Sequence, residues 1–398
     1  MSRARLDDRL VGSLLTWWHG RPAWQQVLLV YALTRVFAFV VVDRTARFQV
    51  ASLWTAPHPS YLDMIDNWDG DWYRRIAEYG YPAVLPRTSL GQVRQNQWAF
   101  YPLYPFLSRG VQWATGLGWS AAASLVALAA GAGAVVVMRS LVERVAGPAL
   151  ALWTVILFCC FPTAPVLQFT YTESLAVLLL VSVLHLVHDQ RYLLGIPVVV
   201  LLALERPIGA PVAAVIALHV LRSWRRDSPG RRTMAAQLAL VLAAAGAVLL
   251  WPIIAGVATA DPRAYAQTMA AWRSDGAVVL FWPWWSSSRY VLGAVVGPLV
   301  LLLVLALTAV WLTRPGAKAV AGDLRAWVVC YLGYLLAVLD PSTSLPRYLF
   351  LAFPFGTMTA AASSSRAYRA VVAASFLAGQ IVWVAWLWRF SPPSDSPP

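Results

Sequence analysis

Residues 234–257 read MAAQLALVLAAAGAVLLWPIIAGV, a run without a charged side chain. A helix of about 20 apolar residues is long enough to cross the hydrocarbon core of a bilayer, so this run predicts a membrane span. Similar runs recur along the chain, and the shorter ones are expected to pack within a bundle: 24–42, 120–138, 149–161, 291–312, 327–339 and 371–387. With 59% hydrophobic and 12% charged residues, the 398-residue sequence predicts an all-α polytopic membrane protein.

The net charge of +13 comes mostly from arginines in short clusters beside the apolar runs. Such clusters are typical of cytoplasmic anchors facing anionic lipid, so they predict membrane lipids as partners and no nucleic acid. The three cysteines, Cys159, Cys160 and Cys330, lie within apolar segments. We interpret them as small buried side chains rather than as a disulfide framework or a zinc site.

The basic clusters also predict the topology. Arg3, Arg5, Arg9 and Arg21 place segment 1–23 in the cytoplasm, so the long loop 44–118 falls outside. Two short passes broken at Glu205-Arg206-Pro207 keep the basic loop after residue 221 in the cytoplasm, since Pro207 removes a backbone donor and charges are costly in mid-bilayer. The count is about eleven spans. They form one membrane domain, 24–390, followed by a Pro/Ser-rich tail, 391–398, expected to be disordered.

Most of the unusual polar residues fall on the predicted outer side of this topology. Arg35 is the exception, since it lies inside the first span and has no evident partner. The others come from separate outer boundaries of the bundle: Asp69, Asp71, Glu173, Glu205, Arg206, Asp340 and Arg347. We therefore expect a functional site that faces the extracytoplasmic side.

The outer loop contains the sequence DNWDGDWYRRIAEYGYP at 66–82, which has helical spacing. It predicts an interfacial amphipathic helix with Trp72, Ile76 and Tyr79 on one face, ended by Gly80 and Pro82. The acids at its start have a structural explanation, since carboxylates cap helix N-termini. Two carboxylates flanked by Trp68 and Trp72 also suit a general base beside a sugar hydroxyl.

An aromatic and proline-rich run, QWAFYPLYP at 97–105, follows in the same loop. Tyr101 and Tyr104 in this run are candidates for lining a site, with an interfacial aromatic belt as the alternative. The sequence WPWW at 282–285 is interpreted as an interfacial anchor. His185, His188 and His219 have no metal-ligand spacing and are interpreted as structural.

The order of these motifs resembles the phosphatidylinositol-glycan V type mannosyltransferases, multi-pass enzymes of the GT-C glycosyltransferase class. The resemblance covers roughly residues 25–355. It rests on Trp68-Asp69-Gly70, on 76–81 and 99–105, on Tyr171-Thr172-Glu173-Ser174 and Arg206-Pro207-Ile208-Gly209, and more loosely on Pro346-Arg347-Tyr348. It implies a GT-C-like bundle whose first extracytoplasmic loop contains interfacial helices.

The resemblance also implies a chemistry. The donor would be a polyprenyl-phosphate sugar, in this family mannose, transferred with inversion in one displacement to a glycolipid or cell-envelope glycan. Asp69 matches the family's first-loop acid and would be the general base, and Asp71 is the second catalytic candidate. No cofactor is implied, and two carboxylates are too few ligands to predict a metal.

Besides Trp68, Tyr101 and Tyr104, three further residues are candidates for binding this substrate. Glu173 would orient it, or would cap the helix that follows. Arg206 and Arg347 would clamp phosphate, because a planar guanidinium binds two phosphate oxygens and a leaving charge must be stabilised. The structural alternatives are ion pairs of Arg206 with Glu205 or Glu173, and of Arg347 with Asp340.

Two other classes of function are compatible with this composition. A transporter or lipid flippase would also have broken helices and intramembrane charges. Against it, the sequence has no evident internal repeat and its polar groups cluster on one side. A non-catalytic membrane scaffold would not need the Asp-Gly-Asp loop.

Overall fold

The computed structural model describes residues 16–390, apart from 19, 53, 274–275, 278, 319 and 321. The predictions for Arg3, Arg5, Arg9 and the tail 391–398 lie outside these residues. The described part is helical, with one isolated β-bridge between Arg87 and Val93. Its first half contains α2 (Ala23–Ala46), α3 (Tyr61–Met64), α4 (Asp69–Tyr79), η1 (Gln97–Ala99), α5 (Leu103–Thr115), α6 (Trp119–Ala146), α7 (Pro148–Cys160), η2 (Ala164–Gln168), α8 (Glu173–His188) and α9 (Tyr192–Ala203).

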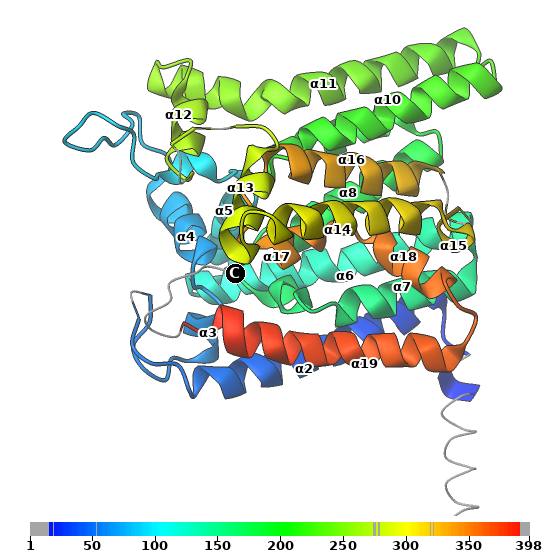
Figure 1. The fold of residues 1–398 in the computed structure, drawn as a ribbon, viewed down its shortest axis with the longest axis horizontal. Helices are drawn as coiled ribbons and strands as arrows, with labels where there is room; N and C mark the ends of the chain where they lie inside the picture. Colours follow the sequence, from blue (N-terminus) through cyan, green and yellow to red (C-terminus); the bar gives the residue numbers. More distant parts are fainter. Residues whose placement is uncertain are drawn as a thin grey trace, which may run out of the picture.

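The second half continues the bundle and ends in a π-helical turn. It contains α10 (Gly209–Arg226), α11 (Arg231–Thr259), α12 (Ala264–Ala270), α13 (Trp282–Leu292), α14 (Val296–Thr313), α15 (Pro315–Lys318), α16 (Gly322–Val338), α17 (Leu345–Leu349), α18 (Pro354–Ala361), α19 (Arg366–Trp383) and η3 (Val384–Trp388). The long helices lie side by side, and α3, α4 and α12 gather at one end of the bundle (Figure 1).

Within the described residues, five helices are long and apolar enough to cross a membrane: α2, α6, α11, α14 and the segment Arg366–Trp388. Three shorter apolar helices, α7, α8 and α9, complete the apolar set. Only 11% of the apolar window of α14 is buried, and the rest exposes leucine and valine side chains that suit contact with lipid. The predicted all-α multi-pass architecture is confirmed, whereas the number of spans stays a prediction.

Two local predictions can be compared directly with these helices. The break at Glu205-Arg206-Pro207 is confirmed, because α9 ends at Ala203 and α10 begins at Gly209. The apolar run 291–312 is not one helix, because Gly293, with φ 87°, ends α13 and a new helix begins at Val296. Glycine adopts such a positive φ without a steric penalty.

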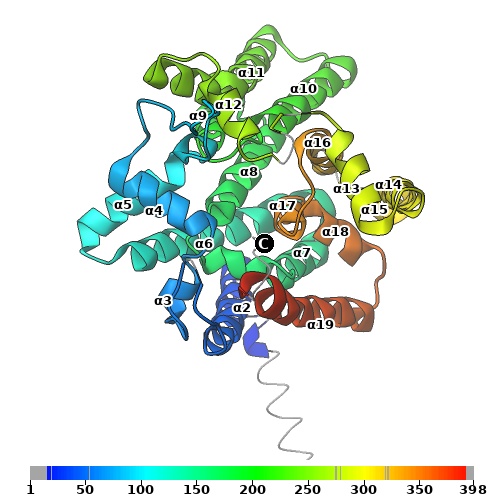
Figure 2. The same cartoon turned by 60° about the vertical axis from the view of Figure 1, so that its left-hand side comes forward.

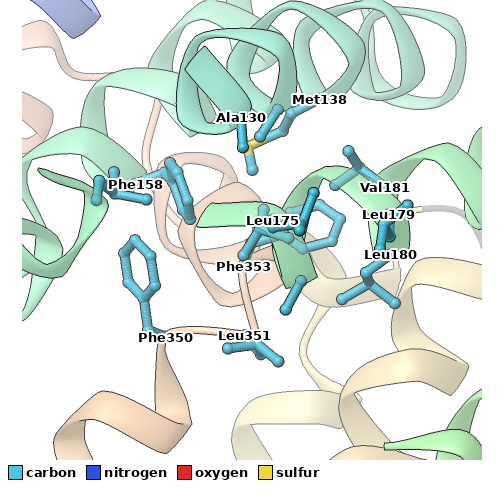
Figure 3. Packing of buried hydrophobic residues seen from close by; sticks show 14 of the residues in the cluster. Ala130, Met138, Phe158, Leu175, Leu179, Leu180, Val181, Phe350, Leu351 and Phe353 are labelled. Atoms are coloured by element: carbon cyan, nitrogen blue, oxygen red, sulfur yellow. The ribbon is translucent and has the colours of Figure 1, made fainter. Parts of the chain in front are cut away.

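The core is built around α8, which lies in the interior of the bundle (Figures 1 and 2). Leu175, Leu179 and Leu180 of α8 pack near the segment 350–353 (Figure 3). The ring of Phe350 stacks on that of Phe158 from α7, with centroids 4.4 Å apart. This packing fixes the positions of the segments that enter and leave α8 and α17.

Arg35, for which the sequence suggested no partner, is held by backbone carbonyls. Its guanidinium donates to the carbonyl oxygens of Ala164 and Cys159, at the junction of α7 and η2. Carbonyls at a helix C-terminus lack partners within the helix, and a buried arginine satisfies them. Arg35 thereby holds η2, the segment that leads to residues 170–173.

Candidate active site

Asp69 is the first residue of α4 and directly follows a strained residue. Trp68 has φ 61° and ψ −115°, a conformation that a bulky residue rarely adopts. The hydroxyl of Tyr171 holds this bend, because it accepts from the Asp69 N–H at 3.1 Å and donates to the Asn67 carbonyl at 3.0 Å. Strain of this kind persists where the surroundings over-determine it, and it clusters at functional sites.

Trp54 in the first loop and Trp388 in η3 also support the bend at Trp68. The indole of Trp68 packs on Trp54, with centroids 4.3 Å apart, and its N–H approaches the Trp388 carbonyl at 3.5 Å. The indole of Trp388 is fully buried and donates to the Met64 carbonyl at 2.8 Å. The sequence predicted only an apolar span after Arg369, and the structure adds this contact with the first loop.

The first turn of α4 packs so closely on the chain that only glycine fits at residue 70. A Cβ at Gly70 would collide with the Thr170 hydroxyl and lie 3.2 Å from Oδ1 of Asp66. The glycine of the Asp-Gly-Asp sequence is therefore explained by a close approach to the segment 170–173. This contact brings α4 to the start of α8, where Glu173 is located.

Asp69, Glu173, Arg206 and Arg347 form one ion-pair cluster. Nη1 of Arg347 lies 2.6 Å from Oδ2 of Asp69 and 3.3 Å from Oε1 of Glu173. Nη1 of Arg206 lies 2.7 Å from the same Glu173 oxygen. The Glu173 side chain is fully buried, whereas 24% of the Asp69 side chain is exposed. Two positive and two negative charges balance in a site of low dielectric constant, so Asp69 is the carboxylate of the cluster that a substrate can reach.

Four separate parts of the chain supply these charges. Glu173 begins α8, Arg206 lies in the break between α9 and α10, and Arg347 lies in the short helix α17. Figure 2 shows α17 beside the interior helix α8. Of the structural alternatives, the Arg206–Glu173 pair is present, whereas Arg347 pairs with Asp69 and Glu173 rather than with Asp340.

The cluster has hydrogen-bonding capacity that the described residues do not use. Oε2 of Glu173 and Nε of Arg347 are buried and have no hydrogen-bond partner among those residues. Buried polar atoms without partners are uncommon, and each calls for an explanation such as a bound ligand. Arg206 and Arg347 also lie over the ring of Tyr348, 5.5 and 5.4 Å from its centroid.

A cavity of about 410 Å³ opens beside Arg206 and Tyr348. Its wall is mostly apolar, with Ile208 and Met269 among the lining residues, and Arg273 supplies a second guanidinium. A cavity that joins an apolar wall to a few charged groups suits an amphiphilic ligand. We name it the Arg206 cavity.

Asp71 is held differently from Asp69. Its carboxylate pairs with Arg74 and, at 2.7 Å, with Arg75, both on the same helix. Asp69 and Asp71 are therefore bound by different arginines and do not present a joint pair of metal ligands. Among the described residues, no group of three or more His, Cys, Asp or Glu side chains is arranged to hold a metal ion.

The two tyrosines predicted from 97–105 lie away from the ion-pair cluster. Tyr104 is fully buried and donates to the Ala123 carbonyl at 2.8 Å, so it fastens α5 to α6. The Tyr101 hydroxyl meets that of Tyr265 at 3.0 Å, and Tyr265 lines the Arg206 cavity. Of the eight predicted residues, the structure brings together Asp69, Glu173, Arg206 and Arg347. Trp68 and Asp71 lie next to Asp69 at the start of α4, whereas Tyr101 and Tyr104 are not part of the cluster.

The predicted faces of α4 are partly wrong. Ile76 is buried as expected, but Tyr79 is exposed, and Tyr73 and Ala77 are buried instead. Burial raises the pKa of Tyr73, so its phenol stays neutral, and its hydroxyl lies 3.4 Å from that of Thr172. The helix packs inward on residues 170–173 rather than only on an interface, which the spacing in its own sequence could not reveal.

Trp119 was not identified as a site residue from the sequence. Its indole donates to Oδ1 of Asp66 at 2.8 Å, and the Thr170 hydroxyl donates to the same oxygen at 2.9 Å. Burial raises the pKa of Asp66 to about 6, although these bonds and Arg74 act in the opposite direction. With 21 tryptophans in the chain, no sequence signal separates Trp119 from the rest.

No model of a known protein family matches the sequence, and no curated protein matches it either. Among solved structures, the fold is similar to the crystal structure of ArnT from Cupriavidus metallidurans bound to undecaprenyl phosphate. The TM-score is 0.50 at 17% sequence identity, and the match covers 85% of this chain and 60% of ArnT. The chain is thus a multi-pass membrane protein with an ArnT-like fold of the GT-C class. At this identity the likeness establishes the fold alone.

Proposed function

We propose that the protein is a membrane glycosyltransferase of the GT-C type that uses a polyprenyl-phosphate sugar as donor. The observation that carries the proposal is the ion-pair cluster beside the Arg206 cavity. In this cluster Arg347 binds the partly exposed Asp69, while Arg206 binds Glu173 and also lines the mostly apolar cavity. The ArnT neighbour was crystallised with undecaprenyl phosphate, which supports a lipid of this class. From the motif resemblance, we propose mannose as the sugar and a glycolipid or cell-envelope glycan as acceptor.

In the proposed reaction, Asp69 takes the proton of the acceptor hydroxyl as the oxygen attacks the anomeric carbon. The bond between that carbon and the phosphate oxygen breaks, and polyprenyl phosphate leaves with the electron pair. Arg206 and Arg347 stabilise the charge that develops on the phosphate, in a site of low dielectric constant. Glu173 holds both guanidiniums in place before the donor arrives.

The resting contacts suggest how donor binding prepares the base. Arg347 divides its Nη1 between Asp69 and Glu173, and its Nε has no partner among the described residues. A bound phosphate would compete with Asp69 for this guanidinium, because charge-assisted bonds to phosphate are strong. Asp69 would then be free to accept a proton when both substrates are present.

The test is transfer of labelled mannose from polyprenyl-phosphate mannose by the full chain in liposomes. Arg206→Gln should reduce the rate by about 10²–10³-fold, the cost of removing one charge-stabilising donor. Arg225→Gln, at the far end of α10, is the matched control and should leave the rate unchanged. The same assay is repeated with polyprenyl-phosphate glucose. If the chain consumes this donor but not polyprenyl-phosphate mannose, the proposal of mannose as the sugar is wrong.

The same liposomes separate the enzyme from the alternative of a transporter or flippase. If the label crosses the bilayer and stays on its polyprenyl phosphate, the protein is a transporter and the glycosyltransferase proposal fails. The proposed extracytoplasmic side has its own test in intact cells. A cysteine introduced as Thr88→Cys, in the outer loop, should react with an impermeant thiol reagent added from outside.

A further inference from the structure

A second cavity, of about 530 Å³, lies beside the first turn of α4. Residues on both sides of Asp69 in the chain line it: Asp66 and Asn67 before it, and Asp71, Trp72 and Arg74 after it. Asp69 and Asp71 differ by about 200° around a helix of 3.6 residues per turn. The cavity on the Asp71 side, named the α4 cavity here, is thus distinct from the cluster on the Asp69 side.

Asn67 in the wall of the α4 cavity has an unsatisfied amide. The residue is 3% exposed, and its Oδ1 has no hydrogen-bond partner among the described residues. Its Nδ2 has only a contact of 3.9 Å with the sulfur of Met64. An amide offers two donors and an acceptor, and a buried one without partners is costly. Asn67 therefore has unused capacity for a ligand that both donates and accepts hydrogen bonds.

The charges of the α4 cavity largely neutralise one another. Arg74 pairs with Asp71 and lies 3.5 Å from Asp66, and Arg75 pairs with Asp71 at 2.7 Å. Asp63 adds a further carboxylate to the wall. Carboxylates facing the space would repel a phosphate, and the arginines among them would repel an amine. A neutral ligand rich in hydroxyl groups meets neither penalty and can use donors and acceptors alike.

The walls and size of the α4 cavity suit a ring. The indoles of Trp54 and Trp72 line it, and Trp72 is braced by Phe100, with centroids 5.6 Å apart. Small-molecule sites of about 300–1,000 Å³ combine such aromatic walls with a few placed polar groups. A sugar or cyclitol ring has apolar C–H faces for the indoles and hydroxyl edges for the carboxylates and the amide.

We propose that the α4 cavity is the acceptor subsite and binds a neutral sugar or cyclitol ring through Asn67, Asp66, Asp71 and Arg74. This inference rests on the proposed function, since the ring held here belongs to an acceptor whose reacting hydroxyl reaches Asp69 past the start of α4, where Asp66 and Asn67 line the cavity. The cavity thus binds a ring of the acceptor other than the one whose hydroxyl reacts. The acceptor class follows as a neutral polyhydroxylated headgroup.

The experiment compares acceptors and variants of the full chain in liposomes, with polyprenyl-phosphate mannose as donor. Methyl α-mannoside and myo-inositol should bind to the native chain in saturation-transfer NMR without donor, while glucosamine and inorganic phosphate should not. Asn67→Leu keeps the branched shape of the side chain and its number of heavy atoms, and removes the groups that form hydrogen bonds. It should raise the acceptor KM about tenfold, the equivalent of about 1.4 kcal/mol, and leave the donor KM unchanged.

Arg74→Gln is the second variant, because the exposed Arg74 side chain can be changed without emptying the core. It should raise the acceptor KM as well. Arg109 is an exposed arginine of the same loop, and Arg109→Gln should leave the acceptor KM unchanged. Unaltered acceptor KM values in Asn67→Leu and Arg74→Gln, or binding of phosphate or glucosamine in place of the neutral rings, would overturn the subsite. If the native chain consumes no donor but its neutral-ring NMR signal is lost in Asn67→Leu, the glycosyltransferase proposal fails and the binding site stands.

Discussion

The two carboxylates of the Asp-Gly-Asp sequence lie two residues apart on α4 and are neutralised in different ways. Asp71 pairs with arginines three and four residues further along its own helix. Asp69 pairs with Arg347, which is 278 residues away in the chain. Asp71 would find its partners in any helix of this sequence, because those positions share a helix face. Asp69 has its partner only when the whole bundle is folded. A substitution of Asp69 therefore tests the tertiary site, whereas a substitution of Asp71 does not.

The largest expected effect tests this contrast through activity. A general base contributes about 10²–10⁴-fold to a rate. Asp69→Asn should therefore lower kcat for mannose transfer by that amount, while Asp71→Asn should leave kcat within about tenfold of the native value. Asn keeps the size of each side chain, so folding is preserved. Equal losses in the two variants would mean that the long-range pair has no special role in the chemistry.

The second prediction tests the same contrast through stability. Arg347→Met leaves the partly exposed Asp69 without a cation and the buried Glu173 with Arg206 alone. Because Arg347 and Glu173 are buried, the change should lower the free energy of unfolding by about 3–5 kcal/mol. Arg75→Met removes a partner of Asp71 that is 51% exposed, so the loss should be about 0–1 kcal/mol. Unfolding of both variants in the same detergent measures the difference, and similar losses would contradict the assignment of a buried long-range pair.

The third prediction concerns pH and Asp66, in the wall of the α4 cavity. Burial raises its pKa from 3.8 to about 6, so the folded state binds the proton more tightly than the unfolded state does. This contribution to stability is complete below pH 3.8 and is lost as the pH rises through about 6, a change of about 3 kcal/mol. Asp66→Asn keeps the Oδ1 that accepts from Trp119 and Thr170, so it should reduce the fall in stability between pH 4.5 and about 7.5.

The measurement for Asp66 is the melting temperature of native and variant chains across this pH range. Other carboxylates titrate in both proteins, so the difference between the two curves isolates Asp66. A variant whose melting temperature falls as steeply as that of the native chain would show that Asp66 is not the group responsible.

The smallest expected effect tests the close approach that brings α4 to α8. Gly70→Ala places a methyl group against the Thr170 hydroxyl and should cost about 1–3 kcal/mol, as overpacking does. Its effect on transfer should exceed that of Gly110→Ala, where an added Cβ meets no atom within 4 Å. The pair Gly70→Ala/Thr170→Ala removes the collision and should regain part of the lost stability. If the double variant regains no stability, the collision with Thr170 is not the cause of the loss.

Much of the fold could be predicted from the sequence. The apolar runs and basic clusters indicate an all-α multi-pass bundle, and Pro207 directly after the charged residues Glu205 and Arg206 marks the break after α9. The helix boundary at residues 293–296 was not predicted, because a single glycine inside an apolar run is not a sufficient signal for the end of a helix. Trp119 and Trp388 were missed as supports of the first loop, since their partners, Asp66 and Met64, are distant in the chain.

The sequence by itself determined that the chain is a membrane protein and which charged residues lie at the predicted outer boundaries. It also determined that Asp71 has arginines within one helical turn. These are consequences of composition and of helical spacing, which act over a few residues. The tertiary structure decided that Asp69 rather than Asp71 joins Glu173, Arg206 and Arg347, and that a strained Trp68 precedes it. Pairing across 278 residues depends on how the helices pack around α8, because each contact there is fixed by side chains from several helices at once.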